Sequence, residues 1–289
     1  MLGQQLLGHE VLTSLQGQAS AAGTGERGPA DRIIRHADVR RMLATQKVYV
    51  EGCRAMARWA TLLNNVQHAH GDEAARAEAA GMLALLTPVV KAMSSDLAVE
   101  SILLAMQCFG GHGYIHDNSV EQHWRDARII PLYEGTNGVQ AMDLLGRKVL
   151  ADGGRKLAAF ISIVNGFVAA QAGHASADEF TRPRAELARL AQEVTEELVL
   201  RHSERGDDAG ASATAYLRLI GHLALAWMWA RAAVVSQARV ASGDPICAAK
   251  ISTARFYFRR LLPQALAHAA EIRAGPESIP DFELDSWPR

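Results

Sequence analysis

The chain has 289 residues, with 30 Lys and Arg against 31 Asp and Glu, so its formal net charge of −1 gives no electrostatic reason to expect nucleic acid or an anionic membrane as a partner. Its three widely spaced cysteines, Cys53, Cys108 and Cys247, indicate free thiols in a reducing compartment rather than a disulfide framework. No uninterrupted apolar run reaches the roughly 18 residues of a membrane span. The N-terminus also lacks the pattern of a secretory signal, so we expect a cytoplasmic protein.

Helical periodicity runs along almost the whole chain. Residues 19–30 are small and glycine-rich and predict a loop. Apolar residues at spacings of three, four and seven then predict a helix from Asp38 to about His70. Pro88 marks a kink or break between two further helices, over about 73–86 and up to about Cys108. The remaining predicted helices cover about 119–128, 136–150, 155–172, 183–204, 211–242 and 245–274. With no strand pattern of useful length, the sequence predicts an all-α fold of two packed helical bundles joined near Gly153.

Glu134 is the candidate catalytic residue. It lies between Tyr133 and Gly135, at the end of a loop that opens into a helix which Thr136 can cap. An aromatic wall, a glycine that permits close approach and a helix N-terminus that favours negative charge suit a carboxylate that abstracts a proton. The ordinary alternative is a solvent-facing loop carboxylate.

A glycine-rich segment precedes this loop by about two dozen residues. Gln107, Gly110 and Gly111 belong to the string QCFGGHGY over 107–114. From spacing alone, the plain interpretation is a helix end with a tight exit. The Cys-x3-His-x3-His spacing over 108–116 differs from zinc signatures, so we expect no metal.

The strings QCFGGHGY and LYEGTNGVQ (132–140) closely resemble the acyl-CoA dehydrogenase family. The resemblance implies that Glu134 removes the α-proton of an acyl-CoA thioester while the β-hydrogen leaves as hydride to FAD. A similar Arg-Asp-Ala segment gives Arg125 a role in positioning the loop, against the alternative of an exposed ion pair. The resemblance also implies that Tyr133 and Gly135 lie beside the substrate. It implies that Gln107, Gly110 and Gly111 contact the pyrophosphate of FAD, which usually belongs to a neighbouring subunit. Thr136 and Asn137 would lie near the adenosine of FAD.

The resemblance covers nearly the whole chain but only part of such an enzyme. Residues 31–152 resemble the family's C-terminal helical domain, and 153–289 resemble the extra helical domain of long members typified by 3-methylmercaptopropionyl-CoA dehydrogenase, whereas 1–30 match poorly. The family's N-terminal helical domain and middle β-domain are missing. We therefore expect a homo-oligomer or a separate N-terminal-half chain as partner, together with an electron-transfer acceptor.

Two departures from the family pattern affect the cofactor site. Gln16-Gly17-Gln18 stands where the long members tend to have Gln-Gly-Arg, so a cationic phosphate contact is lost. Asn137-Gly138 replaces the Ser-Gln of many members, which affects the contact to adenine.

Two other functions compete with the dehydrogenase. One is a catalytically silent helical module for interaction or oligomerisation, which stable self-association without flavin would favour. The other is a DNA-associated relative of the same fold, which salt-sensitive DNA retention would favour.

Overall fold

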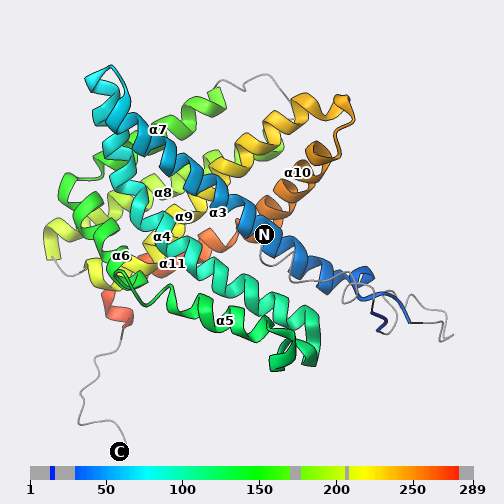
Figure 1. Ribbon diagram of the computed structural model, residues 1–289. Helices are drawn as coiled ribbons and strands as arrows, with labels where there is room; N and C mark the ends of the chain where they lie inside the picture. Colours follow the sequence, from blue (N-terminus) through cyan, green and yellow to red (C-terminus); the bar gives the residue numbers. More distant parts are fainter. Residues whose placement is uncertain (1–13, 17–29, 170–176, 206–207, 280–289) are drawn as a thin grey trace, which may run out of the picture.

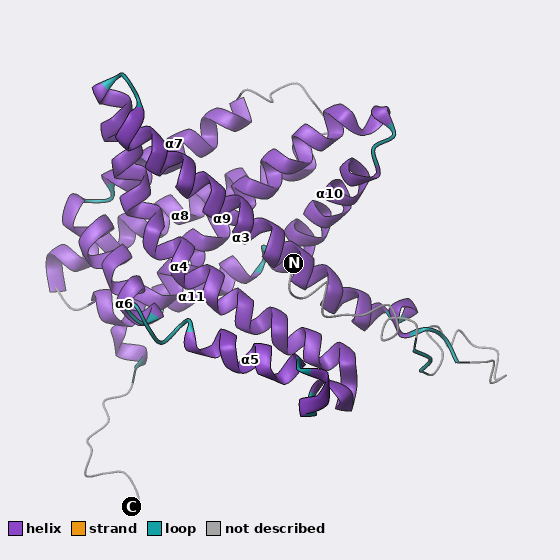
Figure 2. Cartoon of the chain, viewed as in Figure 1, coloured by secondary structure: helices purple, strands orange, loops and turns teal. Residues whose placement is uncertain are grey.

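The computed structural model describes residues 14–16, 30–169, 177–205 and 208–279. Within these residues every element is helical, apart from an isolated bridge between Leu15 and Arg32 (Figure 2). The prediction of an all-α fold is confirmed for this part of the chain. Most of the predicted loop over 19–30 and the end of the helix predicted over 155–172 lie outside the described residues.

Two long helices, α3 (Ala37–Ala69) and α4 (Glu73–Phe109), form a hairpin (Figure 1). The Asp72 side chain caps α4 by accepting a hydrogen bond from Ala74 N at 3.1 Å, as the sequence predicts. The predicted break at Pro88 is wrong, because α4 continues through this residue. Pro88 is buried in the helix interface, where packing on both sides of it outweighs the one backbone hydrogen bond that proline removes.

The segment that carries the candidate residues follows α4. It comprises the short 3-10 turns Gly110–Gly113 and His116–Asn118, then α5 (Val120–Ile129), a loop and α6 (Asn137–Met142). A π-helical turn, Asp143–Val149, and a 3-10 turn continue α6, so the predicted helix over 136–150 is present with a widened second half. The glycine segment and the Glu134 loop lie at opposite ends of α5 (Figure 1).

The second half contains α7 (Arg155–Ala169), α8 (Asp178–Arg205) and α9 (Asp208–Arg239). It closes with α10 (Pro245–Phe256), a π turn over Tyr257–Leu261 and α11 (Gln264–Arg273), so the predicted last helix is interrupted near Pro263. α8 begins five residues earlier than predicted and continues through Pro183. The burial of Phe180 and Arg184 on its first turns explains this early start.

One hydrophobic core joins the two halves across Gly153. Helix α9 supplies much of this core and packs against α3, α4, α8, α10 and α11. Trp227 of α9 lies edge-on to Trp59 of α3, with ring centroids 4.2 Å apart, and to Phe160 of α7 at 6.2 Å. Trp227 and Trp229 are both buried, so their predicted role in packing is confirmed.

Two helices, Glu73–Gly113 and Ala209–Arg239, are long and apolar enough to cross a membrane by length and composition. A count of uninterrupted apolar residues misses them because isolated polar residues divide each run. Half of the apolar window in α4 and 78% of that in α9 is buried inside the protein, as is usual for core helices.

Candidate functional site

Glu134 has an unusual backbone conformation. Its φ is 54° and that of Gly135 is 81°, so two consecutive residues adopt left-handed geometry. For a residue with a side chain this geometry costs roughly 1–2 kcal/mol, and it persists only where surrounding contacts hold it. The Glu134 side chain is exposed and Tyr133 is 47% exposed. The structure therefore presents the carboxylate outward, from a strained and fixed turn.

Side-chain donors hold both carbonyl groups of this turn. Lys91 Nζ of α4 donates to the Gly135 carbonyl at 2.8 Å, and Gln140 Nε2 donates to the Glu134 carbonyl at 3.3 Å. The predicted cap is confirmed, since Thr136 Oγ1 accepts a hydrogen bond from Val139 N at 3.3 Å. These contacts fix the direction in which the Glu134 side chain leaves the loop.

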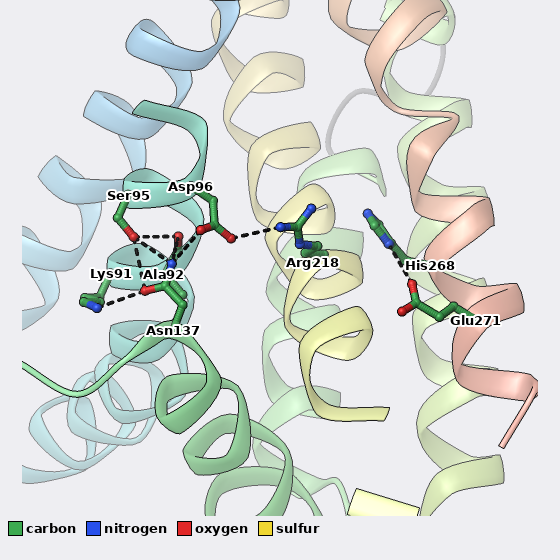
Figure 3. A network of polar contacts seen from close by, with 8 residues as sticks. All are labelled: Lys91, Ala92, Ser95, Asp96, Asn137, Arg218, His268 and Glu271. Carbon is green, nitrogen blue, oxygen red and sulfur yellow. Dashed lines mark hydrogen bonds and ion pairs between the residues drawn. The ribbon is translucent and has the colours of Figure 1, made fainter. Parts of the chain in front are cut away.

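Asn137 fastens the same loop to α4, as Figure 3 shows. Its Oδ1 accepts a hydrogen bond from Lys91 Nζ at 2.9 Å, and its Nδ2 lies 2.7 Å from Asp96 Oδ1, 2.9 Å from Ser95 Oγ and 3.2 Å from the Ala92 carbonyl. The side chain proposed from resemblance as a cofactor contact is therefore engaged with α4.

The loop is not held by Arg125, for which the sequence predicted a positioning role. Arg125 is exposed on α5 and makes no hydrogen bond or ion pair within the described residues. Lys91 and Gln140 hold the loop instead, by donating hydrogen bonds to its carbonyl groups. From the sequence we predicted no role for either residue. The available signal was Lys91 itself, a lone cation in the apolar run TPVVKAM.

A cavity of about 560 Å³ lies between this loop, α4, α9 and α11. Buried His222 forms part of its wall, and burial, followed by the charges of His268 and Arg218, lowers the pKa of His222 to about 3. Across the cavity, burial raises the pKa of Glu100, whose carboxylate accepts a hydrogen bond from Tyr49 at 3.1 Å. The cavity therefore holds a neutral histidine next to ionisable groups.

The glycine segment lines a second cleft, of about 700 Å³, at the other end of α5. Gln107 and Gly110 contribute to its wall, and the exposed Gln107 side chain has no partner within the described residues. Gly110 has a φ of 58°, and a Cβ placed on Gly110 or Gly111 would meet no atom within 4 Å. In contrast, a Cβ on Gly113 would lie 2.6 Å from the Met106 carbonyl. Gly113 is thus required for packing, whereas Gly110 and Gly111 leave the backbone open to a ligand.

The two groups of candidate residues lie at opposite ends of α5. The 10 residues of α5 separate them by about 15 Å. The three cysteines are free, as predicted, and the described residues contain no group of three His, Cys, Asp or Glu side chains that could hold a metal ion. The arrangement offers an exposed carboxylate at one end of α5 and an open, glycine-lined cleft at the other.

Two family models together match most of the chain. Residues 19–150 match the family model described as the acyl-CoA dehydrogenase C-terminal domain, and residues 159–283 match one described as acetyl-CoA dehydrogenase C-terminal like. These matches define helical domains of the acyl-CoA dehydrogenase type. The chain belongs to the acyl-CoA dehydrogenase family.

Among its relatives is the 3-methylmercaptopropionyl-CoA dehydrogenase of Ruegeria pomeroyi, which is 36% identical over 88% of this chain and 44% of its own length. The broad-specificity linear acyl-CoA dehydrogenase FadE5 of Mycobacterium tuberculosis is 32% identical over 86% and 43%, respectively. A crystal structure of the acyl-CoA dehydrogenase of Bacillus anthracis complexed with FAD matches 98% of this chain and 47% of the Bacillus chain, with a TM-score of 0.68. The two sequences are 15% identical, so this match supports the fold alone. The chain spans less than half the length of these relatives.

Proposed function

We propose that this chain supplies the base-bearing C-terminal half of an FAD-dependent acyl-CoA dehydrogenase, and that an N-terminal half acts with it. The observation that carries the proposal is the Glu134 turn, in which a carboxylate is presented outward from a left-handed residue held by Lys91 and Gln140. We also propose a domain boundary near Gly153, which the separate family matches on either side support.

Glu134 acts as the base in this proposal. Its carboxylate takes the α-proton of an acyl-CoA thioester, and the electrons of that C–H bond form the new α,β double bond. FAD, when bound, accepts the β-hydrogen as hydride. Tyr133 and Glu134 are both exposed in this chain, so the water exclusion that strengthens the base has to come from substrate and from the N-terminal half proposed above.

The glycine segment has the character of a diphosphate contact. The open backbone at Gly110 and Gly111, beside the free Gln107 carboxamide, fits the FAD pyrophosphate sterically and chemically. By the family resemblance, the flavin contacted here belongs to a neighbouring subunit. In this proposal the complete site forms in an oligomer. With Asn137 engaged by α4, the Thr136 hydroxyl is the remaining side-chain contact from this loop for adenosine.

The test is reassembly with an N-terminal half supplied as a second polypeptide. Dehydrogenation of a saturated acyl-CoA, followed with an artificial electron acceptor, should require both polypeptides and FAD. Glu134→Gln should lower turnover by about 10²–10⁴-fold, the usual contribution of a positioned base, and leave FAD and thioester binding largely intact. Turnover close to that of the parent would remove the assignment. If the chain associates stably with itself and FAD does not bind even when the N-terminal half is present, the catalytically silent interaction module would be favoured instead.

A further inference from the structure

Lys91 links helix α4 to the backbone that follows the proposed catalytic carboxylate, Glu134. Its Nζ donates to the Gly135 carbonyl and to Asn137 Oδ1, at 2.8 and 2.9 Å. Gly135 directly follows Glu134, and both residues have positive φ. A charged donor on this carbonyl favours the observed peptide orientation over the alternatives that a glycine can adopt.

The contacts continue into the second half of the chain. Asn137 Nδ2 donates to Asp96 Oδ1 at 2.7 Å, and the other oxygen of Asp96 pairs with the Arg218 guanidinium of α9 at 3.1 Å. Figure 3 shows this series running from α6 across α4 to α9. The side chains of Asp96 and Arg218 are 29% and 45% exposed, so their ion pair is the weakest link.

We propose that Lys91 and Asn137 are positioning residues for Glu134, and that Arg218 of α9 reinforces them through Asp96. The catalytic consequence rests on the function proposed above, whereas the structural relay is independent of it. Through this relay, helix α9 of the C-terminal extension contributes to the geometry of the base. Among the described polar contacts, none joins α9 directly to the Glu134 loop. The extension is then part of the catalytic unit.

Hydrogen exchange of the purified chain tests the relay without any activity. The backbone amides of Asn137 and Gln140 are hydrogen-bonded to the Pro131 and Thr136 carbonyls and report on opening of the loop. Lys91→Met keeps the length of the side chain and removes the charged donor. It should accelerate exchange of these amides by about 10- to 100-fold, the range expected for losing a hydrogen bond to a charged group. Exchange in α9 should stay unchanged.

Two further variants make the test specific. Arg218→Met should accelerate the same amides by about two- to fivefold, because a partly exposed ion pair contributes little. The matched control is Lys156→Met, which removes a lysine paired with Asp152 at 2.8 Å away from this loop and should leave both amides unaffected. Equal loop exchange in Lys91→Met and the parent chain would overturn the proposal, as would an effect of Lys156→Met as large as that of Lys91→Met.

A kinetic readout separates positioning from a general structural role. In the reassembled enzyme, Lys91→Met should lower kcat about 10-fold or more with KM nearly unchanged, since misdirection of the base affects the transition state more than substrate binding. Lys91→Arg, which keeps a charged donor, should restore part of the rate. A change in KM alone, or no rescue by arginine, would contradict a positioning role. If no dehydrogenation is found at all, the proposed function fails while the exchange result still decides the relay.

Discussion

Acidification should destabilise the chain through His222. This residue is 2% exposed in α9, and its ring lies 5.9 Å from that of His268 on α11. Burial, followed by the charges of His268 and Arg218, lowers its pKa from 6.5 to about 3 in the folded protein. Between these two values the unfolded chain binds a proton that the folded chain does not. The stability contributed by neutral His222 is therefore fully present above pH 6.5 and is lost as the pH falls toward 3.

The size of the effect follows from the two pKa values. From pH 7 to pH 5 the free energy of unfolding should fall by about 2 kcal/mol through His222 alone. Burial also lowers the pKa of His268, which acts in the same direction, whereas the raised pKa of Glu100 acts in the opposite direction. Because these neighbours are retained in both proteins, the difference between parent and His222→Gln isolates His222 to a first approximation.

Urea unfolding at pH 7 and pH 5 provides the assay. The parent should lose about 2 kcal/mol more stability over this interval than His222→Gln. His68→Gln is the matched control, because His68 is exposed near the end of α3, and it should follow the parent. Parallel pH profiles for the parent and His222→Gln would refute the reasoning, since they would mean that His222 titrates alike in the folded and unfolded chains.

Two further substitutions test the core and the glycine cleft. Phe160→Ala should lower the free energy of unfolding by about 3–5 kcal/mol in urea titrations, because the fully buried ring packs against Trp59 and Trp227; a loss below 1 kcal/mol would contradict a core shared by the two halves. Gly111→Val should weaken FAD binding to the assembled enzyme in fluorescence titrations while thermal unfolding of the chain stays within a few degrees, since its Cβ meets nothing within 4 Å. Unchanged FAD affinity would leave this segment as a helix end only.

The fold was largely predictable because periodicity determines which residues a helix buries. Two errors fall at Pro88 and Pro183, where local rules favour interruption and packing favours continuation. A third falls near Pro263, where the predicted continuous helix is interrupted. At Pro88 and Pro183, both helices bury residues on either side of the proline. Tertiary contacts therefore outweighed the cost of one missing N–H donor.

The site was predictable only in part. Its neighbours and a family resemblance lead to Glu134 as the proposed base, and local spacing identifies the Thr136 cap. Lys91 lies 44 positions before Gly135, and no local pattern pairs residues at that separation. The inward direction of Asn137 likewise depends on α4 lying beneath the loop. Within the described residues, the contacts of the loop are made by Asn137, Lys91 and Gln140 rather than by Arg125. The adenosine contact that resemblance implies for Asn137 stays a prediction.

Anaerobic bleaching of the flavin absorbance tests the dehydrogenase assignment most directly. The chain would be assembled with an N-terminal half and FAD, desalted and mixed with a saturated acyl-CoA. Rapid bleaching is expected with Glu134, and bleaching slower by about 10²–10⁴-fold with Glu134→Gln. Bleaching at equal rates in the two proteins would contradict the central claim that this chain supplies the catalytic base.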